Sequence, residues 1–175
     1  VNKAASGTGS TPLYIAAQGG WLDIVLFLLD HKADARALNG GCSALHTACE
    51  EGHIPVVRAL LATGNVDVSA PTAHGCTPLF LAADKGHLDC IKVLMEHNVV
   101  DIDNNANEYG HTAVFGAAEG GYSHCVKALI EYGADINKGT VGRGATPLYI
   151  AAQLEHESVI KAIVESGKAD VDLAT

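Results

Sequence analysis

The residues TPLYIAAQ at Thr11–Gln18 occur a second time, unchanged, at Thr146–Gln153. Three related stretches lie between them: SALHTACE from Ser43, TPLFLAAD from Thr77 and TAVFGAAE from Thr112. Successive copies begin 32, 34, 35 and 34 residues apart. A fixed period of this length is the sequence signature of a repeat protein, in which each unit is one small supersecondary motif. The pattern therefore predicts five units of one design.

Each copy predicts a short helix. Its opening Thr or Ser is a favoured N-cap residue, because the hydroxyl accepts a hydrogen bond from a free backbone N–H of the first turn. Proline often follows, where its fixed φ suits the first helical residue. Small residues such as Ala16 and Ala17 come next and would let neighbouring helices approach closely. A glycine usually ends this helix, at Gly20, Gly52, Gly86 and Gly121.

A second helix is predicted in each unit from apolar residues at positions i, i+3 and i+4, which form one buried stripe. The stripes are Val25/Leu28/Leu29, Val57/Leu60/Leu61, Ile91/Leu94/Met95, Val126/Leu129/Ile130 and Ile160/Ile163/Val164. Residues that tolerate a positive φ are expected to end four of these helices, namely Gly64, Asn98, Gly133 and Gly167. Neither helix can bury its apolar face alone, so the units must stack into an all-α solenoid of helix pairs.

The units resemble the ankyrin repeat. The family pattern G-x-TPLHxAAxxGHxxxVxxLLxxGAD is matched almost in full by GCTPLFLAADKGHLDCIKVLMEHNVVD from Gly75. The resemblance implies antiparallel helix pairs joined by protruding hairpin loops, with a concave groove lined by the hairpin tips and the first helices. The chain departs from the pattern where Lys32 and Glu155 replace glycine and where Trp21 and Tyr122 replace histidine.

These features predict one ankyrin-repeat domain over residues 1–175, with repeats at about 7–38, 39–72, 73–107, 108–141 and 142–175. The opening VNKAASGTGSTPLYIAAQ parallels INKGTVGRGATPLYIAAQ from Ile136. Residues 1–6 are therefore expected to be the tail of a preceding repeat, and the chain to be a segment of a longer array.

Charge and composition narrow the classes of partner. The chain carries 11 Lys and Arg against 20 Asp and Glu, a formal charge of −9. Nucleic acid is held by clustered cations, so it is not expected as a partner. No apolar run approaches the roughly 18 residues of a membrane helix, which argues against membrane insertion. Five cysteines without a CxxC pair favour reduced thiols and an intracellular location, cytoplasmic or nuclear.

No motif predicts an enzyme, a cofactor or a metal site. The nine histidines include no H-E-x-x-H and no Cys/His group with zinc spacing. The resemblance implies structural hydrogen bonds for His46, His53 and His87. The glycines at 139, 142 and 144 stand in the wrong order for a dinucleotide-binding loop. Cys90 and Cys125 are expected to be buried, and Cys42 and Cys76 to be exposed free thiols beside the groove.

The resemblance also implies which positions face the groove. The hairpin tips are Thr8, Gly40, His74, Tyr109 and Arg143, and the ends of the first helices contribute Gln18, Glu50, Glu51, Asp84, Lys85 and Glu119. Their carboxylates predict a negative strip that attracts a basic segment of a partner protein, with Tyr109 and His111 adding contact area. Ordinary solvated charges are an equally simple interpretation of these carboxylates.

Two functions fit this description. The first is a non-enzymatic module that binds another polypeptide through the groove. The alternative is a structural or regulatory segment whose groove packs against another part of its own protein, such as a channel, kinase or toxin domain. In addition, LIEYGADIN ending at Asn137 resembles the pattern that asparaginyl hydroxylases modify in ankyrin loops, which makes such an enzyme a candidate partner.

Overall fold

The computed structural model describes residues 1–5, 9–97, 100–104 and 107–170. Ten helices lie in these residues, and none of them is long and apolar enough to cross a membrane. The predicted tip residue Thr8 and helix-ending residue Asn98 lie outside the described residues. The helices are α1 Pro12–Gln18, α2 Leu22–Asp30, α3 Ala44–Glu50, α4 Ile54–Ala62, α5 Pro78–Asp84, α6 Leu88–Met95, α7 Ala113–Glu119, α8 Ser123–Glu131, α9 Pro147–Gln153 and α10 Glu157–Glu165.

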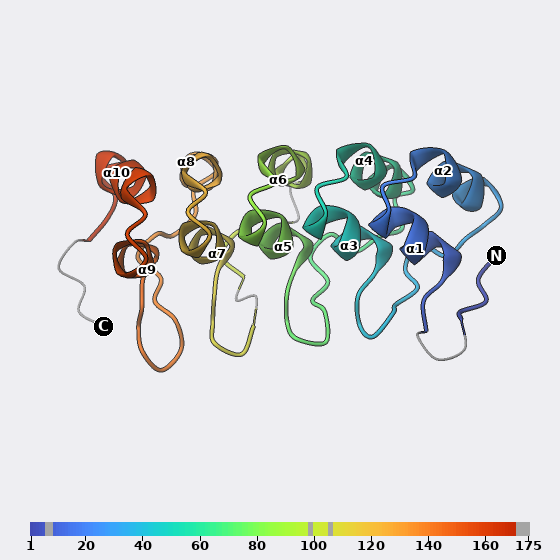
Figure 1. Ribbon diagram of the computed structural model, residues 1–175, viewed down its shortest axis with the longest axis horizontal. Helices are drawn as coiled ribbons and strands as arrows, with labels where there is room; N and C mark the ends of the chain where they lie inside the picture. The colour runs from blue at the N-terminus through green and yellow to red at the C-terminus, as the bar shows by residue number, and fades with distance from the viewer. Residues whose placement is uncertain (6–8, 98–99, 105–106, 171–175) are drawn as a thin grey trace.

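The helices form five pairs that stack in one row (Figure 1). The odd-numbered first helices pack on one another along the row, and so do the even-numbered second helices. Every extensive helix contact of the described residues lies within a pair or between adjacent pairs. The loops before α3, α5 and α9 extend from the same side of the row, below the first helices (Figure 1). The all-α solenoid of stacked helix pairs is thereby confirmed.

The predicted N-caps are present in all five first helices. The hydroxyls of Thr11, Ser43, Thr77, Thr112 and Thr146 each accept a hydrogen bond from the backbone N–H three residues later, at 3.2, 3.4, 3.2, 3.3 and 3.2 Å. All five cap residues are at most 8% exposed. The caps satisfy backbone donors that have no partner inside the helix. Each first helix therefore begins at a position set by its cap.

The second-helix stripes form the core together with the small residues of the first helices. Val25, Val57, Ile91 and Val126 are fully buried, as are Leu60, Leu94 and Leu129. The last stripe is partly wrong, because Val164 is 49% exposed whereas the equivalent Leu61 and Ile130 are 7% and 6% exposed. The reason is position: α10 is the last helix of the described residues, so no further helix packs on that side.

Two residues adopt the backbone conformation that the repeat pattern assigns to glycine. Lys32 has φ 61° and Glu155 has φ 59°, close to the 66° of Gly64 and the 76° of Gly121. A residue with a Cβ atom adopts this conformation at a cost of the order of 1 kcal/mol. The helix pairs still form at both places, because the surrounding packing fixes the turn.

His46 has a structural role, as expected. It is 1% exposed in the first turn of α3. Its Nδ1 accepts from the Ser43 N–H at 3.2 Å, and its Nε2 lies 2.8 Å from the Ala70 carbonyl oxygen, to which it donates. Burial lowers the pKa of His46, and the nearby carbonyls of Ala70 and Cys76 only partly oppose this shift. The folded chain therefore holds His46 neutral.

The lowered pKa of His46 predicts a loss of stability in mild acid. As the pH falls below about 6.5, the unfolded chain binds a proton at this residue and the folded chain does not, so the free energy of unfolding decreases. Above that pH the contribution is fully present. His46→Phe introduces the residue found at the equivalent positions Phe80 and Phe115. When the pH is lowered from about 7.5 to 5.5, this variant should lose less free energy of unfolding than the unmodified chain does. Urea unfolding at both pH values measures this, and equal losses in the two chains would exclude the mechanism.

A second pair of substitutions tests the register of the helices. Leu94→Ala should lower the free energy of unfolding by about 2–5 kcal/mol, because Leu94 is fully buried and leaves a cavity. Lys85→Ala should cost little, since Lys85 is exposed. Urea denaturation followed by circular dichroism compares the two. Similar losses would show that the assignment of buried and exposed positions is wrong.

Candidate functional site

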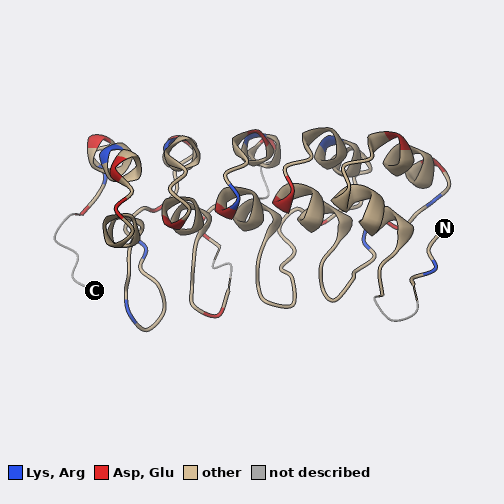
Figure 2. Ribbon diagram, viewed as in Figure 1, with Lys and Arg blue, Asp and Glu red and all other residues tan. Residues whose placement is uncertain are grey.

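The predicted strip residues lie at corresponding places on neighbouring first helices. Gln18, Glu50, Asp84 and Glu119 are the last residues of α1, α3, α5 and α7. Glu51 and Lys85 follow as the C-cap residues of α3 and α5. Figure 2 shows acidic residues at the ends of α3, α5 and α7. The structure thus brings the strip together along adjacent repeats.

The placement of these carboxylates does not favour helix stability. The C-terminal end of a helix carries a partial negative charge, so cations are favoured there and anions are disfavoured by about 0.3–1 kcal/mol. Glu50, Asp84 and Glu119 each stand at such an end. The electrostatics of the helix ends therefore give no reason for these charges.

Histidines of the following repeat brace the backbone of the strip. The Nε2 atoms of His53, His87 and His156 donate to the carbonyl oxygens of Gln18, Glu50 and Glu119, at 3.0, 2.9 and 2.9 Å. These bonds satisfy carbonyls that have no partner within their helices. The backbone of the strip is consequently held in place while its side chains reach solvent. The structural roles expected for His53 and His87 agree with these contacts.

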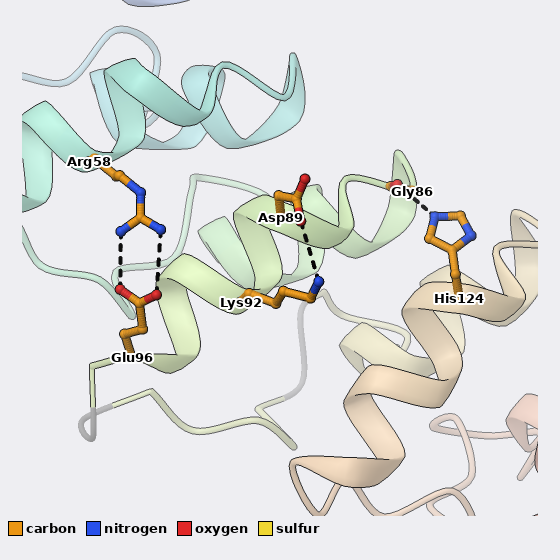
Figure 3. A network of polar contacts seen from close by, with 6 residues as sticks. All are labelled: Arg58, Gly86, Asp89, Lys92, Glu96 and His124. Atoms are coloured by element: carbon orange, nitrogen blue, oxygen red, sulfur yellow. Dashed lines mark hydrogen bonds and ion pairs between the residues drawn. The ribbon is translucent and has the colours of Figure 1, made fainter.

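The junction between α5–α6 and α7–α8 is built differently. Tyr122 replaces the bracing histidine there, and His124, two residues later, contacts the Gly86 carbonyl oxygen through its Nε2 at 3.2 Å (Figure 3). The Tyr122 ring lies against Gly120 of its own repeat, where an added Cβ would come within 2.3 Å of it. Trp21 lies in the same way against Gly19, at 2.6 Å from the Cβ that would be added. A bulky ring at this position thus goes with a glycine two residues earlier.

One cation lies within the strip. Lys85 Nζ is 2.9 Å from Asp84 Oδ2, and the hydrogen bond and charge of Asp84 raise the pKa of Lys85, with a smaller effect from Glu50. The ion pairs of the described residues otherwise include Arg58 with Glu96 and Asp89 with Lys92 on the second helices (Figure 3). Glu50, Glu51 and Glu119 have no cation partner among the described residues.

The two cysteines beside the strip differ from the prediction. Cys42 and Cys76 are free thiols, but both are partly buried and not exposed. Burial raises the pKa of each thiol, and the nearby charges of Glu50 for Cys42, and of Asp84 and Glu50 for Cys76, raise it further. Both thiols are therefore protonated and weakly nucleophilic at neutral pH. Cys90 and Cys125 are fully buried, as predicted.

Tyr109 and His111 lie in the hairpin loop that leads to α7. The Tyr109 side chain is 60% exposed, and its ring centroid is 6.0 Å from that of His111. His111 in turn contacts the buried ring of Phe115, at 4.3 Å between centroids. Asn107 shapes this loop, because its Oδ1 accepts from the Tyr109 and His111 N–H groups at 3.0 and 3.2 Å. The sequence analysis did not identify Asn107 or Phe115 as supports.

A cavity of about 510 Å³ lies between this loop and the loop before α5. Its lining consists of Ala73, His74, Gly75, Cys76, Asn107, Glu108 and Tyr109. Cys76 lines this cavity, and the charges of Asp84 and Glu50 contribute to the raised pKa of its thiol, so the cavity lies near the acidic strip. In the described residues, no group of three or more His, Cys, Asp or Glu side chains could hold a metal ion.

Stacked helix pairs with protruding loops define a helical repeat solenoid. The family model for ankyrin repeats in three copies matches residues 1–72, 64–140 and 104–175. The chain belongs to the ankyrin repeat family, whose members are generally non-catalytic modules for protein–protein interaction. No individual curated protein matches the chain.

The structure places Asn137 between two loops. Its side-chain N–H donates to the Lys168 carbonyl oxygen at 2.9 Å, and its Oδ1 accepts from the Asp170 N–H at 2.8 Å. Modification of Asn137 by an asparaginyl hydroxylase stays a prediction, and these bonds must open for the enzyme to reach it. Intact mass after incubation with such an enzyme should increase by one oxygen atom. The Asn137→Ala variant is the negative control and should keep its mass. An unchanged mass of the unmodified chain would contradict the prediction.

Proposed function

We propose that the acidic strip and the cavity beside Tyr109 bind a basic segment of a partner polypeptide. The observation that carries this proposal is the set of carboxylates without a cation partner among the described residues, Glu50 and Glu51 at the end of α3 and Glu119 at the end of α7, on either side of the Asp84–Lys85 pair at the end of α5. An acidic surface raises the local concentration of cationic partners and speeds their association. The charge of the whole chain, −9, acts in the same direction.

The spacing of the strip suits an extended segment. Packed helices lie about 8–10 Å apart, so the carboxylates recur at about that interval along the row. An extended chain advances about 3.3 Å per residue. A segment that crosses the repeats would therefore meet an acidic helix end about every third residue. Lys or Arg at that spacing is the pattern we expect in the partner.

Tyr109 provides the apolar part of the contact. Exposed charges contribute mainly to the rate of association, whereas affinity in protein interfaces is concentrated in a few aromatic and Arg residues. The ring of Tyr109 is exposed at the edge of the cavity and is supported from behind through His111 and Phe115. An apolar side chain of the partner would occupy the cavity, with cationic residues on the strip beside it.

Reversal of two charges tests this proposal. Glu50→Lys with Asp84→Lys should weaken binding of the partner recovered by affinity capture on the unmodified chain, and should flatten the salt dependence of that binding. Calorimetry or surface plasmon resonance at several salt concentrations measures both quantities. Tyr109→Ala should weaken binding without changing the salt dependence.

Glu131→Lys with Glu165→Lys is the matched control. It makes the same change in net charge on α8 and α10, where both residues are exposed. If the control weakens binding as much as the strip variant does, only the overall charge matters. If the strip variant leaves affinity and salt dependence unchanged, the carboxylates are ordinary solvated charges and the proposal is wrong.

A further inference from the structure

The charge of the strip changes from one first helix to the next. The end of α3 contributes two carboxylates, those of Glu50 and Glu51. The end of α5 combines Asp84 with Lys85, so that its two charges cancel. The end of α7 contributes the carboxylate of Glu119. The strip therefore has two negative positions, at α3 and α7, with a neutral position between them at α5.

The ammonium group of Lys85 is held inside the strip. Its Nζ lies 2.9 Å from Asp84 Oδ2. The hydrogen bond and the charge of Asp84 raise the pKa of Lys85, and Glu50 and Tyr122 have smaller effects in the same direction, whereas burial opposes them. Electrostatic effects weaken with distance, so the ammonium lies near α3 and near the start of α8 as well as at the end of α5. Lys85 is thus a positive centre shared by neighbouring repeats.

This cation belongs to one repeat only among those that the structure describes. The C-cap residues of the other first helices stand at the same position, and all of them are exposed, as Lys85 is: Gly19, Glu51, Gly120 and Leu154. A cation at a helix C-terminus gains about 0.3–1 kcal/mol from the helix dipole, but the other four helices form without it. The fold therefore does not require a lysine at this position.

We propose that Lys85 sets the charge pattern that the strip accepts: the partner segment carries a basic residue at α3, an acidic residue at α5 and a basic residue at α7. The inference rests on the proposed function and changes the residue expected at the middle position. A lysine ammonium has three N–H donors, and Asp84 accepts from one of them. A carboxylate of the partner can accept from the others. A basic residue at this place would instead meet the like charge of Lys85.

The packing of the helices gives the spacing of this pattern. α3 packs on α5, and α5 packs on α7. Two steps of about 8–10 Å place the ends of α3 and α7 about 16–20 Å apart. An extended segment, at about 3.3 Å per residue, covers this distance in about six residues. The acidic residue of the partner should therefore lie about three residues from each of the two basic ones.

Three synthetic peptides test the inference. Each carries two Arg residues about six positions apart in an otherwise uncharged sequence, and the residue halfway between them is Glu, Gln or Lys. Affinity for the unmodified chain, measured by NMR titration at low salt, should fall in the order Glu, Gln, Lys. Each step should be about 2–5-fold, the size of one exposed ion pair. The positive charge of the peptides rises in the same order, so general attraction to the acidic chain would give the opposite ranking.

Two lysine substitutions show whether Lys85 causes the ranking. Lys85→Gln should reverse it, because Asp84 is then free to pair with the central Lys of the peptide. Lys92→Gln is the matched control, since Lys92 is paired with Asp89 on α6 and its side chain is 50% exposed, against 48% for Lys85 (Figure 3). It removes the same charge outside the strip and should keep the ranking.

The inference is wrong if the Lys peptide binds the unmodified chain best, if the three peptides bind equally, or if Lys85→Gln keeps the ranking. The proposed function survives these results as long as Glu50→Lys with Asp84→Lys weakens binding of the peptides. If no peptide binds the unmodified chain, or if this charge reversal has no effect, the proposed function is wrong and the inference fails with it.

Discussion

Contact between neighbouring helix pairs is the interaction on which this structure depends. Each pair is too thin to enclose a core of its own, and the residues with the least exposure, such as Leu60, Leu94 and Leu129, lie where adjacent pairs meet. Stability in such an array is approximately a sum of unit terms and nearest-neighbour terms. Ile24 in the first described pair and Val164 in the last are 48% and 49% exposed, because only one other helix pair among the described residues packs on each of these pairs.

The polar contacts of the bracing histidines also join only adjacent repeats, and they do not use the side chains of the acidic strip. Histidine rings reach back to the preceding first helix and satisfy its last carbonyl, as in the 2.9 Å contact of His87 with Glu50. The contact uses the backbone carbonyl of the half-buried Glu50 and does not use its carboxylate. Folding thus uses the main chain of the helix ends, and recognition can use their side chains. Residues at these ends can vary in charge without disturbing the stack.

Much of the fold could be predicted because its signals are local and repeated. A Thr or Ser cap with a following proline marks where each first helix begins. The spacing of 32–35 residues between the caps marks where each repeat begins. The exposure of Val164 could not be predicted from its own helix, since it depends on which helices pack against α10, the last helix of the described residues. The partial burial of Cys42 and Cys76 likewise depends on contacts with neighbouring residues in space, which the spacing of the sequence does not give. The ion pair of Asp84 with Lys85 and the support of Tyr109 through Phe115 could not be predicted either. They depend on the geometry of side chains, which the spacing of residues in the sequence does not give.

The restriction of contacts to adjacent pairs also affects how such a chain can change its length. Removal or duplication of a whole unit alters two junctions and leaves all the others as they were. A change of length in steps of one whole unit is therefore physically tolerated. Insertion of part of a helix pair would instead disturb that pair and its junctions with its neighbours, whereas the caps and stripes of later units are set locally and would stay as they were.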